Sequence, residues 1–379
     1  MAVKMESDIN SNLIPSKVLR SDFSTVGNVF LVLLDFKPDT VNRKSKFTLK
    51  TIILVAILFW LLVSLSVHAG YESESEVYYN SSSHKIKISI DKKFLIPNEY
   101  FCQIHTPYLL VIVPSRIESF KVREVIRETY ASLSRDRVSE VFGQKIDVVV
   151  RTLYVIGTND NGTTEKSVFF ENMKYRDILQ VDIADTYYNL TDKMLHALKW
   201  IDLYCKHVTY ILKADEDVFV NIGILVEQLK RYIPSEKGSI YGHIFDTPNH
   251  LGVLRDGRWA VTHEEYPLEN YPPYAQGTSY TMSKNLVRKI IHSAQNFPYL
   301  HIEDVFITGI VAGKIHKAEL VKLNKTSKWG DGLPSPCGFA KNQRLAQHRM
   351  TPHLMYQTWK ALMSYQITCM TYRGRTMKH

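Results

Sequence analysis

The sequence predicts an α/β domain with a mostly parallel central sheet, preceded by a single transmembrane helix. Short apolar runs alternate with amphipathic stretches from about residue 108 onward, and such alternation is typical of parallel strands joined by helical crossovers. Residues 51–67, TIILVAILFWLLVSLSV, carry no charged side chain. With its flanks, this run has about the length that a helix needs to cross a bilayer.

The apolar run divides the chain into parts. Four basic residues lie between positions 43 and 50, whereas acidic and serine residues follow the run, so the positive-inside rule places the N-terminal part in the cytosol. A small-residue signal near Ala69 leaves signal-peptide cleavage open, but the long run and the long preceding tail favour an uncleaved anchor. The predicted parts are a cytoplasmic tail (1–50), a transmembrane signal anchor (51–70), a lumenal stem (71–100) and a lumenal domain (101–379).

The charge of the chain excludes one class of partner. The net charge is +9 over 379 residues, with acidic and basic side chains interspersed. No block of lysine and arginine resembles a nucleic-acid-binding arm, and no zinc-finger spacing occurs. We therefore expect no nucleic-acid partner, and an acidic or phosphorylated small molecule suits the basic charge equally well.

Two markers of a lumenal location follow the apolar run and are absent before it. The N-glycosylation sequons are at Asn80, Asn161, Asn189 and Asn324. The cysteines are Cys102, Cys205, Cys337 and Cys369, and an oxidising compartment permits one or two disulfides among them. Their spacing fits no zinc site and does not reveal the pairing.

The first half of the lumenal domain contains strands and helices in alternation. Strands are predicted over 108–115, 147–157, 177–182 and 207–214, and helices over 122–133, 165–175 and 189–205. The third helix has one clear apolar face, made by Leu190, Met194, Leu198, Ile201 and Cys205. This order of elements is what a parallel sheet with helical crossovers requires.

An acidic triplet, Asp215–Glu216–Asp217, follows the last of these strands. In open α/β sheets, ligands bind at the carboxyl ends of the strands. Mn²⁺ and Mg²⁺ prefer carboxylate oxygens and share their coordination with substrate phosphates. The triplet by itself predicts either a cation site or a solvated turn.

A second acidic pair, Glu303 and Asp304, opens the apolar stretch over residues 299–313. Negative charge is favoured at a helix N-terminus, so the pair can serve as simple first-turn capping. Alternatively, one of the two carboxylates is a general base near the cation site.

Five stretches of the chain, in this order over about residues 108–360, share one resemblance. They are REVIRETYAS, YRDILQVDIADTYYNLTDKM, YILKADEDVFVN, EEYPLENYPPYAQGTSYTMS and IEDVFITG. Together they resemble the β-1,3-galactosyltransferase family, which also contains β-1,3-N-acetylglucosaminyltransferases and the fringe enzymes. The departures from the family pattern are Tyr130 for Trp, Glu216 for the middle acid of the triplet, Ala275 for Cys and Ser279 for Gly. Ala275 removes or reroutes one family disulfide, and Ser279 bears on the shape of the sugar pocket.

The resemblance implies a GT-A fold, a UDP-sugar donor, Mn²⁺ or another divalent cation, and inversion at the anomeric carbon. By motif position, Asp217 is a direct metal ligand, while Asp215 contacts the ribose or a metal-bound water. His348 is the second metal ligand implied by the family pattern, and His353 is a weaker candidate. Asp304 is the catalytic base and Glu303 its supporting neighbour.

The resemblance also implies a set of donor-binding residues around the triplet. Arg123 and Arg127 lie four apart on one helix face, suited to phosphate or uracil, although a solvated face would show the same spacing. Lys193 and Glu216 follow from the motif alone, and Gly277 permits close backbone approach to the donor.

We therefore expect a Golgi membrane enzyme, single-pass with a lumenal catalytic domain, that transfers galactose from UDP-galactose in β-1,3 linkage to a glycan. Two alternatives stay open: the same chemistry with UDP-N-acetylglucosamine or UDP-N-acetylgalactosamine, and a catalytically silent glycan-binding glycoprotein. The acceptor depends on loops such as residues 243–259, and the sequence identifies neither the acceptor nor the oligomeric state.

Overall fold

A computed structural model describes residues 53–61, 88–134, 140–141, 144–323, 336–341 and 344–364. The chain divides into two compact units, Met1–Ser73 and Glu74–His379. In the first unit, residues 53–61 form an exposed helix, and none of the helices in the described ranges is long and apolar enough to span a membrane. The predicted tail over 1–50 and the rest of the predicted anchor lie outside those ranges, so both stay predictions.

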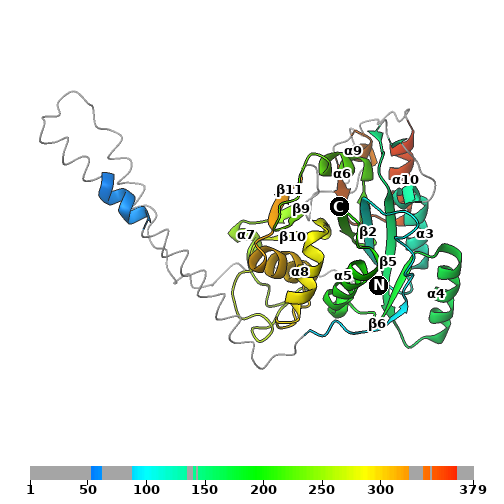
Figure 1. Ribbon diagram of the computed structural model, residues 1–379, viewed down its shortest axis with the longest axis horizontal. Helices are drawn as coiled ribbons and strands as arrows, with labels where there is room; N and C mark the ends of the chain where they lie inside the picture. The colour runs from blue at the N-terminus through cyan, green and yellow to red at the C-terminus, as the bar shows by residue number, and fades with distance from the viewer. Residues whose placement is uncertain are drawn as a thin grey trace, which may run out of the picture. The chain divides into compact units, whose positions relative to one another are not determined.

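The second unit is built on one sheet of eight strands (Figure 1). In spatial order the strands are β1 (Phe94–Ile96), β6 (Ile178–Ala184), β5 (Val150–Thr158), β2 (Leu109–Pro114), β7 (Tyr210–Ala214), β10 (Tyr274–Ser283), β9 (Ser239–Phe245) and β11 (Glu319–Lys322). The four strands predicted from the sequence, β2, β5, β6 and β7, are mutually parallel. β10 runs antiparallel to both β7 and β9, and β1 runs antiparallel to β6. The sheet is therefore mixed, with a parallel centre, rather than parallel throughout.

Helices cover both faces of this sheet. They are α3 (Phe120–Glu128), α4 (Gly162–Tyr175), α5 (Leu190–Tyr204), α6 (Ile222–Leu229), α7 (Pro248–Leu251), α8 (Asn285–Ala294), α9 (Pro336–Ala340), α10 (Pro352–Met363), the π-helix η5 (Val305–Ile315) and the 3₁₀ turns η3 (Tyr130–Ser134) and η4 (Tyr187–Asn189). Two small strand pairs complete the unit: β3 (Glu140–Val141) with β4 (Gln144–Lys145), and β8 (Phe219–Val220) with β12 (Ala346–Gln347). The three predicted helices correspond to α3, α4 and α5.

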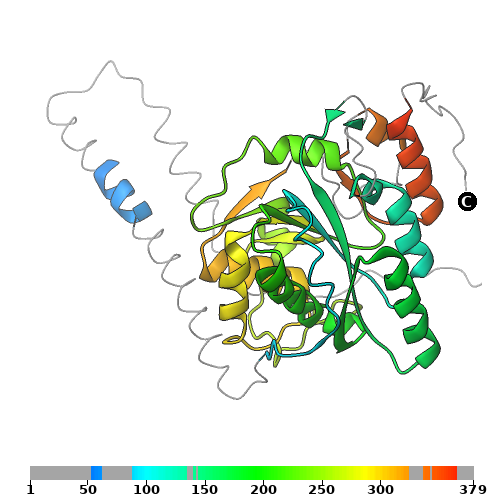
Figure 2. The ribbon, with the colours of Figure 1, turned by 45° about the vertical axis from the view of Figure 1, so that its right-hand side comes forward.

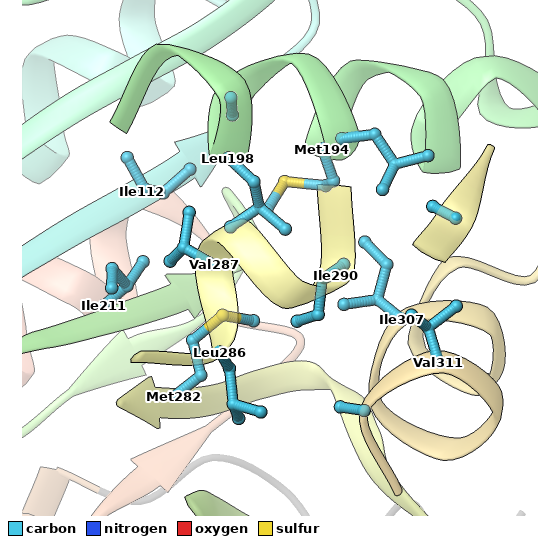
Figure 3. Close-up of a cluster of buried hydrophobic side chains, with 14 of the residues drawn as sticks. Ile112, Met194, Leu198, Ile211, Met282, Leu286, Val287, Ile290, Ile307 and Val311 are labelled. Carbon is cyan, nitrogen blue, oxygen red and sulfur yellow. The ribbon is translucent and has the colours of Figure 1, made fainter. Parts of the chain in front are cut away.

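Strand β2 shows why the sheet is buried on both sides. Leu110 and Ile112 join one core, beneath α5, α8 and η5, and Figure 3 shows Ile112 in that core among side chains from those helices. Leu109, Val111 and Val113 join a second core, under α3, α6 and α10. Figure 2 shows α3 and α10 side by side on this second face. An unbroken apolar run such as LLVIV is what a strand covered on both faces requires.

The folded unit begins earlier than the predicted boundary at residue 101. Ile88 and Ile90 are buried in the core beneath α5, and β1 pairs with β6 at the edge of the sheet. A disulfide between Cys102 and Cys205, with Cα atoms 5.3 Å apart, joins this N-terminal segment to the end of α5. The last part of the predicted stem over 71–100 therefore packs on the sheet, because the apolar side chains of Ile88 and Ile90 are buried there.

The strand order creates a topological switch point between β2 and β7. From β2 the chain continues to β5 on one side, and β7 is placed on the other side of β2. The connections after these two strands therefore diverge and leave room at their carboxyl ends, where open α/β sheets bind ligands. Ser115 and Asp215 each follow directly after one of these strands.

Candidate active site

The acidic triplet forms a tight turn at this switch point. The Asp215 N–H donates to the Thr278 carbonyl of β10 at 3.0 Å, and the Val218 N–H donates back to the Asp215 carbonyl at 3.1 Å. The Asp215 side chain is half-buried and Asp217 is exposed. The turn is therefore fixed at both ends while its last carboxylate faces solvent.

Lys213, which the sequence analysis did not select, holds the centre of the site. Its Nζ donates to Asp215 Oδ1 at 2.5 Å and to the Gly277 carbonyl, and it lies 3.4 Å from Glu303 Oε2. Burial by itself lowers the pKa of Lys213, but Asp215 and Glu303 outweigh burial and raise the pKa above its usual range. The signal was present in the sequence, because a lysine inside the all-buried strand YILKA requires an anionic partner.

Glu303 is a buried member of the same network. The Tyr280 hydroxyl donates to Glu303 Oε1, and the other carboxylate oxygen faces Lys213. Burial raises the pKa of Glu303 to about 7, with Lys213 opposing the rise and Asp304 adding to it. Only 3% of the surface of Glu303 is exposed, so Glu303 contacts the network from inside the fold.

Asp304 is held by two backbone donors. Its Oδ2 accepts from the Gly277 N–H at 2.6 Å, and its Oδ1 accepts from the Val305 N–H at 3.0 Å. Burial raises the pKa of Asp304, although Lys213 and these N–H groups oppose the rise. A Cβ at Gly277 would lie 2.7 Å from Asp304 Oδ2. The absence of a side chain at Gly277 therefore permits the position of Asp304, and the donor contact expected from the sequence stays a prediction.

The Glu216 side chain is not directed to a donor. Its carboxylate accepts from the Ser115 hydroxyl at 2.7 Å, from the Arg116 guanidinium at 2.8 Å and from the Ser119 hydroxyl at 3.1 Å. These residues form the connection between β2 and α3. The predicted donor-binding role is corrected to a structural one, in which Glu216 joins the acidic turn to the end of β2.

The predicted role of Arg123 needs the same correction. The side chain is fully buried and donates to Glu171, to the Ser115 hydroxyl and to the carbonyls of Arg116 and Ile117. These bonds occupy all five N–H donors of a guanidinium. Neither a donor contact nor a solvated face is possible for Arg123, which instead fixes the chain after β2.

Arg127 is likewise buried in ion pairs. It donates to both oxygens of Asp177, at 2.8 and 2.9 Å, and to Glu171 at 2.6 Å. Its guanidinium also lies over the rings of Tyr154 and Tyr175, 4.5 and 4.2 Å from their centroids. Arg127 therefore ties α3 to α4 and β6 and does not reach the switch point.

Lys193 also acts from inside the fold. Its ammonium is paired with Asp185 and donates to the Ser115 carbonyl at 3.2 Å. The second oxygen of Asp185 accepts from the Ile117 N–H at 2.6 Å. The motif-based donor contact is therefore replaced by a buried pair that supports residues 115–117 from below.

A strand pairing brings the backbone of His348 close to the acidic turn. β12 pairs with β8 in the register Gln347 to Phe219, and the Met350 N–H donates to the Asp217 carbonyl at 2.9 Å. The backbone of His348 is thereby placed beside the acidic turn, with its side chain buried. His353, the weaker candidate, is exposed on α10 and contacts Gln357.

The described part of the chain contains no cluster of three His, Cys, Asp or Glu side chains able to hold a metal ion. A cation shared with a diphosphate does not need one, because Mg²⁺-type sites use one or two carboxylates together with water and phosphate oxygens. The exposed Asp217 carboxylate, beside the half-buried Asp215, fits this donor set.

The sequons differ in how they present asparagine. Asn161 is exposed, and its side-chain oxygen caps the start of α4. The Asn189 amide nitrogen donates to the Ala184 carbonyl at 2.9 Å, so a glycan there would break this bond. Asn80, Asn324 and Cys369 lie outside the residues that the structure describes.

Comparison with known proteins gives consistent matches over this region. The family model described as Galactosyltransferase matches residues 121–321. Mouse β-1,3-galactosyltransferase 5 is 31% identical over 272 residues, which cover 71% of this chain and 83% of the relative. Human β-1,3-galactosyltransferase 2 is 30% identical over 240 residues, covering 62% and 54% respectively.

Solved structures are more distant. A mannosyltransferase from Pyrobaculum calidifontis, in complex with GDP-Man and Mn²⁺, aligns with a TM-score of 0.34 and 12% identity, covering 78% of this chain and 80% of its own. A galactosyltransferase, LgtC, in complex with donor and acceptor sugar analogues, also aligns at 0.34, with 10% identity, covering 68% and 97%. The fold assignment therefore rests on the sheet order described above.

The protein is an α/β domain with paired acids at its switch point, and the galactosyltransferase model matches this region. It is therefore a hexosyltransferase. The chain belongs to the β-1,3-galactosyltransferase family.

Proposed function

We propose that the protein transfers galactose from UDP-galactose to a glycan acceptor, in β-1,3 linkage and with inversion, on a GT-A-type fold. One observation supports this most directly: Lys213 joins the acidic turn after β7 to Gly277 and Glu303, and Gly277 in turn orients Asp304. A donor site and a candidate base are thereby held in one rigid network. Such pre-organisation is what a single in-line displacement requires.

Asp304 is the proposed general base. Both carboxylate oxygens are fixed by backbone N–H donors, so the carboxylate cannot rotate away from an incoming acceptor hydroxyl. Its burial raises the carboxyl pKa, which makes the ionised form a stronger proton acceptor. Asp304 removes the hydroxyl proton while the oxygen attacks the anomeric carbon from the face opposite the departing UDP.

The donor is proposed to lie between the acidic turn and the segment after β2. Asp217 and His348 are the residues that would hold a divalent cation, with Asp215 reaching the ribose or a bound water. Such a cation stabilises the charge that develops on a departing diphosphate. Glu216 and Lys193 keep the backbone of residues 115–117 in place beside this site.

The identity of the donor sugar depends on residues around the sugar pocket, among them Ser279. Ser279 pairs with Ala214 directly before the acidic turn and stands where relatives have glycine. Transfer of N-acetylglucosamine or N-acetylgalactosamine is therefore the second candidate. A silent glycan-binding protein is disfavoured, because Asp215, Asp217 and Asp304 are all present.

We further propose a single-pass Golgi membrane location with the catalytic unit in the lumen. The apolar run with basic residues on its N-terminal side supports this topology, as does the disulfide between Cys102 and Cys205.

Calorimetric titration of UDP into the detergent-solubilised chain, with and without Mn²⁺, tests the site without any known acceptor. The sugar nucleotides follow in the same cell, and the tightest one indicates the donor. Asp304→Asn should abolish transfer and keep Mn²⁺-dependent UDP binding. Persistent transfer would remove Asp304 as the base, and absence of all nucleotide binding in the wild type would overturn the proposed function.

A further inference from the structure

An exposed aromatic surface lies beside the acidic pair and has no role in the chemistry above. It consists of Tyr187 and Tyr188 in η4 and of Arg258 and Trp259 in the loop before β10, with the buried ring of His301 in contact with Tyr188. The exposed fractions are 39% for Tyr187, 64% for Tyr188 and 37% for Trp259. Isolated exposed aromatic residues are ordinary, but a group of them at one place indicates a contact surface.

The members of this aromatic surface are in mutual contact. The Arg258 guanidinium lies 5.6 Å from the centroid of the Tyr187 ring and 5.9 Å from that of Trp259. The Tyr188 and His301 ring centroids are 5.0 Å apart. Arg258 itself is exposed, so its N–H donors are accessible to a bound molecule beside the two rings.

The loop that carries Arg258 is held from the inside by another arginine. Arg255 donates to the carbonyls of Val261, Tyr266 and Leu268 at 2.7 to 3.0 Å. Gly257, with a φ of +80°, forms the turn, a conformation that side chains other than glycine rarely adopt. The position of Arg258 and Trp259 is therefore fixed by the fold.

His301 adds a polar group whose bonding is incomplete. Its Nδ1 lies 2.6 Å from Glu265 Oε1, and its own backbone N–H donates to the same oxygen at 2.9 Å. Because a carboxylate only accepts, Nδ1 carries a proton, and in the corresponding neutral tautomer Nε2 is an acceptor. The side chain is 5% exposed, and Nε2 has no partner among the described residues. Buried polar atoms in proteins usually have a hydrogen-bond partner, so a bound molecule is a candidate partner for Nε2.

The aromatic surface is tied to the proposed base. His301 precedes Asp304 by three residues, and the Thr191 hydroxyl at the start of α5 donates to the Leu300 carbonyl at 2.8 Å. This bond joins the helix that follows η4 to the segment that carries Asp304. Burial and the nearby Asp304 charge raise the pKa of Tyr187 to about 12, in keeping with this proximity.

The aromatic surface and the expected metal ligands are carried by different elements. The expected donor contacts, Asp217 and His348, lie at the β8–β12 pairing, whereas the aromatic surface is built on η4 and the segment before η5. A pyranose presents one face of C–H groups, which the electron-rich face of an aromatic ring attracts. Its hydroxyls supply both donors and acceptors, which match His301 Nε2 and the Arg258 N–H groups.

We propose that Tyr187, Tyr188, Arg258, Trp259 and His301 form the acceptor-saccharide subsite. The pyranose ring that receives the new sugar stacks on the tyrosine faces, and one of its hydroxyls donates to His301 Nε2. This inference rests on the proposed transferase function and adds the residues that select the acceptor.

The test compares acceptor and donor kinetics in three variants of the full chain. The acceptor probes are methyl β-glycosides of galactose, N-acetylglucosamine and N-acetylgalactosamine, with release of UDP as the readout. Tyr188→Ala removes a stacking ring, and His301→Phe keeps the ring but removes the nitrogen acceptor. Phe170→Ala removes an aromatic side chain that is 69% exposed on α4, away from the site, and is the matched control.

We expect each of the first two variants to raise the KM for the methyl glycoside about tenfold. The KM for the sugar nucleotide should change less than twofold, and Phe170→Ala should change neither. An unchanged acceptor KM in Tyr188→Ala, or a rise confined to the donor KM, would overturn the inference.

Binding of the same glycosides, followed by saturation-transfer NMR with UDP and Mn²⁺ present, separates this inference from the transferase proposal. If the wild type binds a methyl glycoside but releases no UDP, the transferase proposal fails. Weaker glycoside signals in Tyr188→Ala would still support the subsite. Equal signals in the two proteins, or no glycoside signal in either, would refute it.

Discussion

The Lys213 ammonium lies between carboxylates that come from different elements, Asp215 after β7 and Glu303 before η5. Taking these charges out of water is costly, and only their mutual attraction offsets the cost. Removing one member leaves the others buried without compensation. At the scale of single residues, substitutions in this network are therefore expected to lower the stability of the fold most.

Replacing Lys213 with methionine should lower stability by roughly 3–5 kcal/mol, because two acids lose their buried counter-charge. The double variant Lys213→Met/Glu303→Gln should be less destabilised than the sum of the two single variants. Denaturant unfolding of all four proteins measures the coupling. Strict additivity would contradict the network.

The stability of the protein should depend on pH through Glu303. Its pKa is raised by burial from a usual 4.5 to about 7 in the folded protein, so the folded state binds the proton more tightly than the unfolded state. The free energy of unfolding therefore decreases as the pH rises from about 4.5 to about 7, by about 3 kcal/mol at most. Thermal unfolding in EDTA should show a decline over this window that is shallower in Glu303→Gln. Parallel curves for the two proteins would show that another group is responsible.

At the scale of elements, the site depends on how β10 meets η5. Gly277 of β10 approaches the Asp304 carboxylate, which precedes η5, so closely that a Cβ would lie 2.7 Å from Oδ2. The Thr308 hydroxyl of η5 accepts from the Ala275 N–H at 2.9 Å, and this bond fixes the two elements against each other. A side chain at Gly277 must therefore displace Asp304 and not the strand.

Gly277→Ala should lower kcat by about a hundredfold, because a shift of about 1 Å in a catalytic group has effects of that size. UDP binding should be retained, since a Cβ at Gly277 meets Asp304 and not the acidic turn, which the Asp215 N–H holds to the Thr278 carbonyl. Enzyme assays with UDP calorimetry measure the two effects separately. Gly242→Ala is the control, because a Cβ there meets its nearest atom at 3.4 Å. An active Gly277→Ala enzyme would argue against the assigned position of Asp304.

At the scale of the whole molecule, the second unit combines a parallel α/β half with an antiparallel extension. The parallel half supplies the acidic turn, and the extension through β10 and η5 supplies Gly277, Glu303 and Asp304. The Cys102–Cys205 disulfide fastens the segment around β1 to the end of α5, at the opposite end of α5 from η4.

Removal of this disulfide should destabilise the molecule without harming the site. Its cysteines are separated by 103 residues, for which loop-closure entropy gives about 4–5 kcal/mol. Cys102→Ser/Cys205→Ser should therefore lower the thermal midpoint while UDP affinity stays within twofold. Loss of UDP binding in a protein that is still folded would contradict this separation.

The sequence by itself determined the α/β class, the strands and helices from 108 to 214, the acidic turn and the acidic pair. These follow from local patterns, because apolar periodicity and adjacent acids are visible within a few residues. It also established the family, since five motifs occur in order.

Only the tertiary structure decided which charges face the site. Arg123, Arg127, Lys193 and Glu216 looked available in sequence but are buried in ion pairs or bonded to the chain after β2, while Lys213 was overlooked inside a strand. The antiparallel placement of β10 was equally hidden, since pairing direction depends on a partner strand far along the chain. The sequence does not show which opposite charge a side chain will pair with. That pairing is decided only in the folded protein, where water is excluded and particular opposite charges lie in contact.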